Sequence, residues 1–186
     1  MTEKQKMLAG LLYDANNDPD LIAERLVCKD KIYNYNRLRP SDLLCRKTLL
    51  LEILGKTGGN FIIEQPFYCD YGYNISIGEN FYSNFNLVIL DEASVTFGDN
   101  VFIAPNVGIY TASHPLDAAT RNLGLETAYP VMIGSNVWIG AGVQILPGVS
   151  IGDNSVIGAG SIVNKSIPAN VLAVGNPCRV VREIAP

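Results

Sequence analysis

The fold is decided by the stretch from Ile133 to Pro168, where the sequence repeats every six residues. It reads Ile133-Gly-Ser-Asn-Val-Trp, Ile139-Gly-Ala-Gly-Val-Gln, Ile145-Leu-Pro-Gly-Val-Ser, Ile151-Gly-Asp-Asn-Ser-Val, Ile157-Gly-Ala-Gly-Ser-Ile and Val163-Asn-Lys-Ser-Ile-Pro. Each unit opens on an aliphatic residue, and a small residue or glycine usually follows it. Self-similarity at a fixed period indicates a repeat architecture, in which each unit buries its apolar face against its neighbours.

The same period runs from about Ile75 to Val174, with earlier units opening at Ile77, Phe97 and Ile103. A short strand carries one aliphatic side chain inward, and the Gly, Asn or Asp that follows lets the backbone turn a corner, often with positive φ. Three such strands make one triangular coil, and coils stack at the ordinary inter-strand spacing of about 4.8 Å. The sequence therefore predicts an all-β protein built as a parallel β-helix. A two-sheet β-sandwich is the alternative.

The repeat has two defects. The step from Ile89 to Phe97 is eight residues rather than six, so two extra residues lie near 91–95. Between Ile109 and Ile133 the repeat disappears, and about twenty residues, 111–130, show no periodicity. A long segment that leaves a rigid scaffold is more often functional than ornamental, so we expect a protruding functional loop there.

The N-terminal residues follow a helical pattern instead. Thr2 and Gln5 form a capping box ahead of apolar residues at helical spacing, namely Met7, Leu8, Leu11 and Leu12. A second helix is predicted to begin near Asp18, with Leu21, Ile22 and Leu26 on one face, and a third to run from 41 to about 54. We therefore predict a helical cap over residues 1–58 and a β-helix domain over 59–186.

Composition excludes several classes of protein. The chain has 186 residues, is 48% hydrophobic and carries a net charge of −4, so it has material for a core and no basic footprint for nucleic acid. Its apolar runs are too short to span a membrane and its N-terminus lacks a signal-peptide pattern, which favours a cytoplasmic location. The four cysteines are scattered, and we predict buried, reduced thiols. A single histidine excludes chemistry that needs two or three imidazoles.

That histidine, His114, stands inside the non-repeating segment. Imidazole is the side chain whose ordinary pKa lies nearest neutrality, and Pro115 keeps His114 out of the helical region. In acyl transfer an alcohol loses its proton as it attacks a thioester, and one imidazole within hydrogen-bond reach suffices as general base. A carboxylate such as Glu126 could orient the other ring nitrogen and stabilise the imidazolium. The alternative is a loop histidine that caps a turn.

Polar residues near the first repeats could bind the hydroxyl groups of a sugar. Asp70, Asn84, Asp91 and Glu92 are the candidates, although Asn84 and its neighbour Asn86 fit a corner or an asparagine ladder equally well. Counting along the repeat places Asn84 and His114 on different faces of the prism. We hypothesise that the two meet across a subunit contact, as a three-fold oligomer would allow.

The end of the coil carries a basic cluster and two glycine-rich corners. Lys165, Arg179 and Arg182 suit a phosphate-rich ligand, and ordinary surface solvation is the alternative for each alone. Gly140-Ala-Gly and Gly158-Ala-Gly present bare backbone, along which an extended pantetheine arm could lie. The sequence contains neither a P-loop nor a dinucleotide-binding fingerprint.

Together these residues resemble the maltose and galactoside O-acetyltransferases of the hexapeptide-repeat superfamily over essentially the whole chain. The opening Met7-Leu-Ala-Gly-Leu-Leu-Tyr-Asp14 is similar to the family's N-terminal cap. The segment from Tyr110 to Gly140, with His114-Pro-Leu-Asp, Arg121 and Gly124-Leu-Glu126, resembles the maltose branch. The closing Gly175-Asn-Pro-Cys-Arg-Val is typical of the family as well.

The resemblance implies a left-handed β-helix, a homotrimer with active sites between subunits, acetyl-CoA as the acetyl donor, no metal, and His114 as the general base. The residues that would face the sugar acceptor are Asp14, Arg25, Asp70, Tyr82, Asn84, Glu92 and Glu126. The residues that would line the coenzyme A groove are Trp138, Ala141, Ala159, Asn164, Lys165, Arg179 and Arg182. The backbone N–H of Ala141 would help to stabilise the tetrahedral oxyanion.

The sequence departs from the galactoside branch at three of these positions. Galactoside enzymes tend to carry Ser in place of Asp70, Asp in place of Glu92 and Ser in place of Ala141. Among maltose, glucose and a galactoside as acceptors, these departures favour glucose or maltose.

Three other functions use the same coil. Carbonic anhydrases of this architecture need three histidines, which this chain lacks. A non-catalytic scaffold would not require the His-Pro loop or the basic cluster. An acetyltransferase for serine, a xenobiotic or an antibiotic shares the coil, the histidine and the coenzyme, and the Tyr-Asp cap favours the sugar branch over it.

Overall fold

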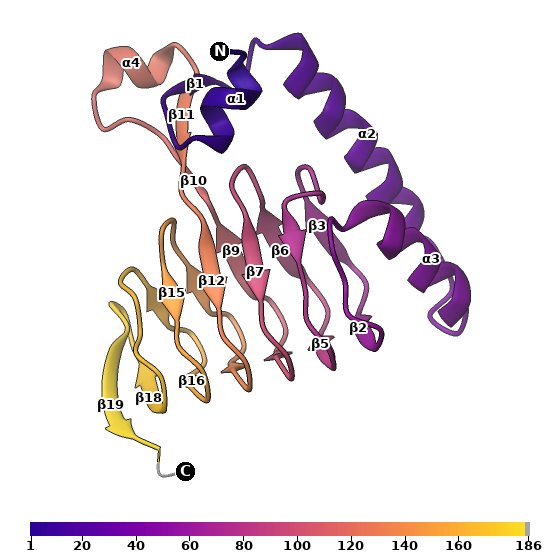
Figure 1. Cartoon of the computed structure of the whole chain (residues 1–186), viewed down its shortest axis with the longest axis vertical. Helices are drawn as coiled ribbons and strands as arrows, with labels where there is room; N and C mark the ends of the chain where they lie inside the picture. The colour runs from indigo at the N-terminus through magenta and orange to yellow at the C-terminus, as the bar shows by residue number, and fades with distance from the viewer. Residues whose placement is uncertain (185–186) are drawn as a thin grey trace.

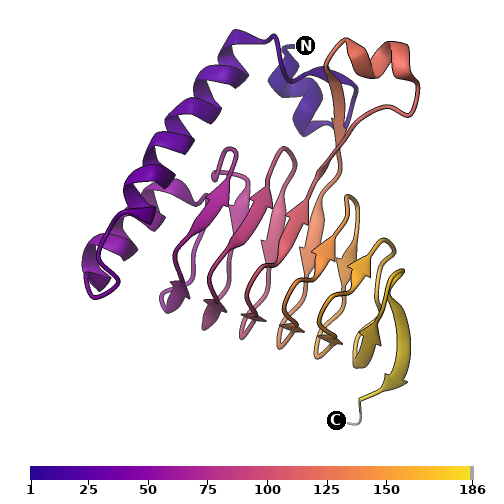
Figure 2. The ribbon, with the colours of Figure 1, turned by 180° about the vertical axis from the view of Figure 1, so that it is seen from behind.

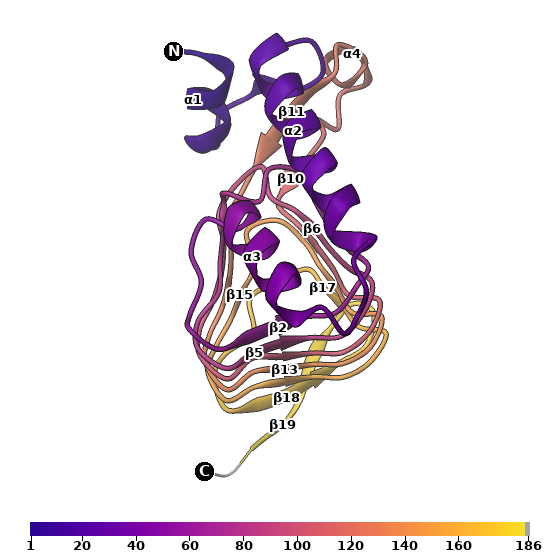
Figure 3. The same ribbon diagram turned by 90° about the vertical axis from the view of Figure 1, so that its right-hand side faces the viewer.

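The computed structural model describes residues 1–184 and has the predicted architecture, a left-handed parallel β-helix with helices at its N-terminal end (Figure 1). Residues 185 and 186 of the predicted 59–186 domain lie outside the described residues. Viewed along its axis, the coil has a triangular outline (Figure 3). Three parallel sheets form its sides, so the β-sandwich alternative is wrong.

The three sheets are named here by their strand number. The four-stranded sheet contains β4 (Ile75–Ser76), β7 (Val95–Phe97), β12 (Val131–Ile133) and β15 (Ser150–Ile151). The five-stranded sheet contains β3 (Phe67–Cys69), β6 (Leu87–Leu90), β9 (Gly108–Tyr110), β14 (Gln144–Ile145) and β17 (Ile162–Val163). The seven-stranded sheet contains β2 (Phe61–Ile63), β5 (Phe81–Ser83), β8 (Phe102–Ile103), β13 (Trp138–Ile139), β16 (Val156–Ile157), β18 (Val171–Val174) and the antiparallel β19 (Arg179–Glu183).

The core is a set of aliphatic ladders inside the triangle. Ile103, Ile139 and Ile157 pair in register on neighbouring strands of the seven-stranded sheet, and all three are buried. In-register stacking places each side chain against its equivalent one coil away, which is why one aliphatic per hexapeptide is enough to fill the interior.

The corners are turned by residues with positive φ, as predicted. Asn80, Asn100 and Asn136 are at one corner with φ of 55°, 56° and 58°. Asparagine tolerates this region better than other residues with a side chain. The side-chain amides of these residues hydrogen bond from coil to coil, and the ladder runs from Asn60 through Asn80, Asn100, Asn136 and Asn154 to Asn170.

Three helices precede the coil: α1 (Glu3–Leu8), α2 (Pro19–Asn36) and α3 (Leu43–Ile53). The capping box at Thr2 and the predicted start at Asp18 are confirmed. Helix α3 lies across the open end of the triangle (Figure 3), and its Leu50 and Ile53 join the main core. Its N-cap is Asp42, so it starts two residues later than predicted.

Two details of the predicted cap are wrong. Helix α1 ends before Leu11 and Leu12, because the chain turns at Gly10 with φ of 69° and continues into a strand. On α2 the buried face is formed by Leu21, Cys28, Ile32 and Tyr35, whereas Leu26 is exposed.

The predicted loop at 111–130 is an ordered arm rather than an irregular loop. It contains β10 (Ala112–Ser113), α4 (Ala118–Asn122) and β11 (Leu125–Ala128). The arm rises from the coil beside α1 (Figures 1 and 2). Strand β11 pairs on one side with β10 and on the other with β1 (Tyr13–Asp14), so the cap and the arm share an antiparallel sheet.

The predictions for the cysteines and for membrane-spanning segments can be compared with the structure. Cys28, Cys69 and Cys178 are buried free thiols, as predicted, but Cys45 is exposed on α3. Among residues 1–184, no helix combines the length and the apolar character needed to cross a membrane.

Candidate active site

His114 follows β10 at the base of the arm and is half exposed, with 51% of its side chain accessible. Its Nδ1 lies 3.2 Å from the backbone carbonyl oxygen of Leu125. A carbonyl can only accept, so Nδ1 carries the hydrogen and Nε2 keeps its lone pair in the neutral ring. The residue that orients the ring is therefore Leu125 through its backbone, and not Glu126 as the sequence suggested.

Glu126 lies on the other side of the imidazole. Its Oε1 is 3.7 Å from Nε2 of His114, and its Oε2 accepts a hydrogen bond of 2.9 Å from the hydroxyl of Tyr13. The Tyr13 side chain is only 1% exposed, and burial, followed by the negative charge of Glu126, raises the pKa of its hydroxyl, which therefore stays protonated. A carboxylate facing Nε2 would stabilise the imidazolium that forms when this nitrogen accepts a proton.

Three acidic residues gather at the corner where the repeat slips. Asp91 is fully buried, and its Oδ1 accepts from the backbone N–H groups of Asp70 and Tyr71 at 3.0 and 2.9 Å. Burial raises the pKa of Asp91 to about 6. Burial, followed by a hydrogen bond to Asp70, raises the pKa of Glu92 to about 9, so Glu92 is protonated at neutral pH and can donate. Lys29 of α2 lies 3.4 Å from Asp70.

Helix α2 also brings Arg25 toward this corner. Its guanidinium donates to the hydroxyl of Tyr71 at 2.7 Å and to the backbone oxygen of Ala15 at 2.6 Å. Asp14 turns the chain between β1 and α2, because its Oδ1 accepts from the backbone N–H groups of Asn16 and Asn17. The structure thus brings Asp14 and Arg25 of the cap to the same end of the molecule as the arm.

Tyr82 and Asn84 lie on another side of the prism. Tyr82 is on β5 of the seven-stranded sheet, and Asn84 is at the corner that follows this strand. The Oδ1 of Asn84 accepts from the backbone N–H of Phe85, whereas Asn86 donates to Asn106 in a ladder. Asn84 is therefore a corner residue and Asn86 a ladder residue. Within residues 1–184, no hydrogen bond joins Asn84 to His114, in line with the different faces inferred from the repeat.

Three of the predicted coenzyme A residues share this second side, namely Trp138, Ala141 and Ala159. Trp138 is 55% exposed on β13 and pairs in register with Phe102, which pairs with Tyr82. Ala141 and Ala159 are exposed at the corner that carries Asn84. Their following glycines, with φ of 70° each, have open space where a Cβ would stand, so the backbone there is bare as predicted. At the preceding Gly140 and Gly158 a Cβ would collide with the next segment of the chain, so the prediction is wrong for these two glycines.

The basic residues lie at the far end of the coil. Arg179 and Arg182 are exposed on β19, and Lys165 is exposed at the corner after β17. Arg179 donates to the side-chain oxygen of Asn164 at 3.5 Å, which brings the tail and the last corner together.

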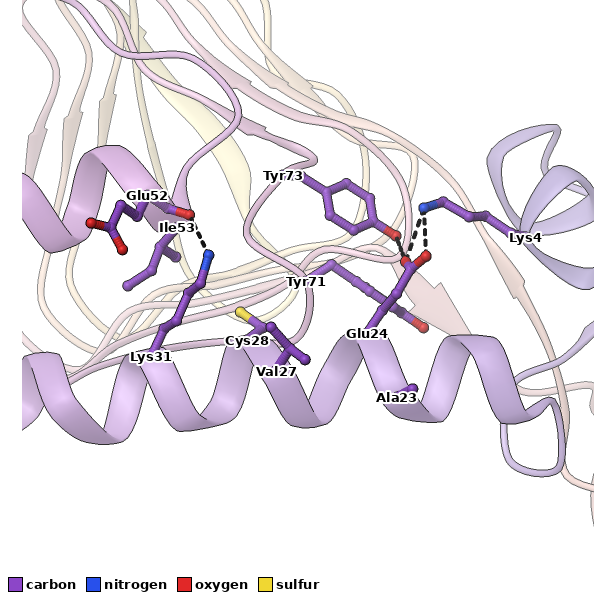
Figure 4. Close-up of a pocket in the computed structure, with 10 residues that line it drawn as sticks. All are labelled: Lys4, Ala23, Glu24, Val27, Cys28, Lys31, Glu52, Ile53, Tyr71 and Tyr73. Atoms are coloured by element: carbon purple, nitrogen blue, oxygen red, sulfur yellow. Dashed lines mark hydrogen bonds and ion pairs between the residues drawn. The ribbon is translucent and has the colours of Figure 1, made fainter.

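One cavity of about 480 Å³ lies outside this arrangement, between the helices and the first coil (Figure 4). Lys4 and Tyr73 both donate to Glu24 there, at 2.8 and 2.7 Å, and Lys31 donates to the backbone oxygen of Glu52. Its polar groups are thus paired with one another, and no residue predicted to perform chemistry lines it. Groups of His, Cys, Asp and Glu able to hold a metal ion are absent from the described part of the chain.

Sequence reasoning missed three groups of this site: the Tyr13 hydroxyl, the Leu125 carbonyl and the Thr111 hydroxyl, which lies 3.2 Å from Glu92. Tyr13 stands in the Tyr-Asp pair of the cap, and this pair was the available signal. The positions of the Leu125 carbonyl and the Thr111 hydroxyl depend on the path of the backbone, and no sequence pattern indicates them.

Two sequence families match the chain. Residues 6–58 match the maltose acetyltransferase hexapeptide capping motif, and residues 130–165 match the bacterial transferase hexapeptide with six repeats. A Saccharomyces cerevisiae protein, named only as an acetyltransferase with no acceptor given, is 61% identical over 97% of this chain and 92% of its own length.

Solved structures of similar fold cover the whole chain. A maltose O-acetyltransferase from Clostridium difficile is 52% identical, with a TM-score of 0.98 over 100% of this chain and 99% of its own. A galactoside acetyltransferase in complex with coenzyme A is 49% identical, with a TM-score of 0.96 over 100% of this chain and 92% of its own.

Proposed function

This chain belongs to the hexapeptide-repeat acetyltransferases of the maltose and galactoside O-acetyltransferase type, and we propose that it transfers an acetyl group from acetyl-CoA to a sugar hydroxyl with His114 as general base. The observation that carries the proposal is the orientation of the single imidazole. Its Nδ1 faces a carbonyl oxygen and its Nε2 faces Glu126, so the nitrogen with the lone pair is available to a hydroxyl group.

The reaction needs one proton to move. Nε2 of His114 takes the proton of the acceptor hydroxyl as the oxygen attacks the thioester carbonyl of acetyl-CoA. The tetrahedral intermediate then collapses, the acetyl group stays on the sugar oxygen, and the coenzyme A thiolate leaves and takes up the proton from the imidazolium of His114, which becomes neutral again. An N–H of the bare corner at Ala141 is suited to the developing oxyanion, because the structure gives it no acceptor among residues 1–184.

The two substrates are assigned to two sets of residues, which come together on the side of the prism that carries Tyr82 and Trp138. We assign the acceptor to Asp14, Arg25, Asp70, Tyr82, Asn84, Glu92 and Glu126. We assign coenzyme A to Trp138, Ala141, Ala159, Asn164, Lys165, Arg179 and Arg182. Tyr82 and Asn84 belong to a different corner from His114, so this assignment requires a homotrimer in which they come from a neighbouring subunit.

Glucose or maltose is the proposed acceptor. The proposal is supported by Asp70, whose partly exposed carboxylate can accept a hydrogen bond from a sugar hydroxyl and is itself hydrogen bonded by the buried Glu92. The cap matches the maltose acetyltransferase capping motif, which supports the same branch.

The test is acetyl-CoA turnover over glucose, maltose, a galactoside, serine and chloramphenicol, with His114→Ala measured beside the wild type. We expect turnover with glucose or maltose, and a loss of at least about a hundredfold in kcat for the variant. Full turnover by His114→Ala would refute its role as base. Preference for serine or chloramphenicol would move the protein to another acceptor class, and no turnover with any acceptor would favour a scaffold.

A further inference from the structure

The cap reaches the imidazole through a single pair of side chains. Tyr13 and Glu126 stand opposite each other in the antiparallel pairing of β1 and β11. Directly opposed residues share one face of a sheet, so the tyrosine hydroxyl meets the carboxylate at 2.9 Å. The aromatic ring is 1% exposed and packed with Met7, Leu21 and Ala128 in a small core of its own.

This hydrogen bond fixes which oxygen of Glu126 faces His114. With Oε2 engaged by Tyr13, Oε1 remains 3.7 Å from Nε2. The glutamate side chain is 14% exposed, and without the phenol it could rotate away from the ring. Because the buried Tyr13 hydroxyl donates a hydrogen bond to this oxygen, it holds the Glu126 side chain in one rotamer.

We infer that Tyr13 is a positioning residue of the catalytic machinery, which acts through Glu126 to keep a negative charge beside Nε2 of His114. The inference rests on the proposed role of His114 as base. It assigns a function to the cap beyond closing the end of the coil, because, within the described residues, the tyrosine is the one cap side chain that hydrogen bonds to the carboxylate beside the imidazole.

Other charged groups surround His114 and Glu126 and contribute to the electrostatic potential at the imidazole. Arg25 of α2 interacts favourably with Glu126 and Asp70, while Glu92 of the coil is protonated near neutral pH. On the arm itself, Arg121 donates to the backbone oxygens of Pro115 and Leu116 and does not reach the ring nitrogens. The carboxylate closest to Nε2 is thus Glu126.

The test compares Tyr13→Phe, Glu126→Gln and the double variant with the wild type. Tyr35→Phe is the matched control, because Tyr35 is also a fully buried phenol of the cap region, and its hydroxyl donates to a backbone oxygen far from the arm. We expect Tyr13→Phe and Glu126→Gln each to lower kcat by about tenfold and to move the acidic limb of the kcat/KM profile to lower pH. Tyr35→Phe should leave that limb in place.

Two further outcomes decide the proposal. If Tyr13 acts through Glu126, adding Tyr13→Phe to Glu126→Gln changes kcat and the profile no further, and an additive effect would overturn the inference. The NMR titration of the single histidine gives a readout without turnover, and its midpoint should fall in both variants. An unchanged midpoint in Tyr13→Phe would refute the inference. If the wild type turned over no sugar but its histidine midpoint still fell in Tyr13→Phe, only the proposed function would be refuted.

Discussion

The Nδ1 atom of His114 lies 3.2 Å from the backbone carbonyl oxygen of Leu125, which sits eleven residues further along the chain on the other strand of the arm. The contact is possible because β10 and β11 pair as an antiparallel hairpin. It fixes the ring before any substrate binds, since the carbonyl accepts a hydrogen from one nitrogen only.

The neutral ring should therefore be the tautomer with hydrogen on Nδ1. We expect a two-bond ¹H–¹⁵N spectrum at high pH to show Nδ1 protonated and Nε2 bare. The chain has one histidine, so the spectrum contains a single imidazole and needs no assignment by mutation. A dominant Nε2–H form would contradict the geometry and would remove the lone pair from the proposed base.

The buried Glu92 should make the protein less stable as pH rises. Its pKa is raised from an ordinary 4.5 to about 9, so the folded chain holds a proton that the unfolded chain loses between these values. The contribution of this proton to the free energy of unfolding is complete below pH 4.5. It decreases as the pH rises toward about 9, by at most about 1.4 kcal/mol per pH unit.

Urea unfolding between pH 7.5 and 8.5 measures this slope, because burial raises the pKa of the neighbouring Asp91 only to about 6 and its titration is nearly complete in this range. Glu92→Gln has no proton to lose and should flatten the slope relative to the wild type. Equal slopes for the two proteins would show that Glu92 is ionised in the folded state.

The asparagine ladder offers a test of backbone strain at one corner. Asn136 has φ of 58° and bonds to Asn100 and Asn154 at 3.0 and 2.9 Å. Replacement by alanine or by glycine removes the same amide bonds, but only alanine is strained at this φ. After the greater chain entropy of glycine is subtracted, we expect Asn136→Ala to be less stable than Asn136→Gly by about 0.5–1 kcal/mol in urea unfolding. A more stable alanine variant would mean that the corner has relaxed out of the positive-φ region.

Mixed oligomers test the proposed subunit boundary. Asn84→Ala and His114→Ala should each be weakly active alone. In randomly mixed trimers of the two, about a quarter of the sites would draw an intact His114 and an intact Asn84 from adjacent subunits, and activity should return in that proportion. If mixed trimers, confirmed by native mass spectrometry, recovered no activity, the proposed boundary would be wrong. Both residues would then come from the same subunit, or Asn84 would not belong to the active site.

The six-residue repeat is sufficient to specify the β-helical coil, and it can be read from the sequence alone. Inward aliphatics such as Ile139 and corner residues such as Asn136 recur in the chain at the spacing at which they recur in space. Local chemistry therefore decided the strands, the corners and even the position of the slip near Asp91. The helix caps at Thr2 and Asp18 were readable for the same reason, since a cap bonds to residues three positions away.

What surrounds His114 was decided only by the tertiary structure. Tyr13 and Glu126 are 113 residues apart, and their contact depends on where the cap lies once α2 has packed on the coil. The sequence identified the imidazole because it is the only one, and it named Glu126 as a carboxylate that stabilises the imidazolium, but it could not show that the Leu125 carbonyl orients the ring. The raised pKa of Glu92 likewise depends on burial at a corner that three separate segments close, and no spacing in the chain encodes that burial.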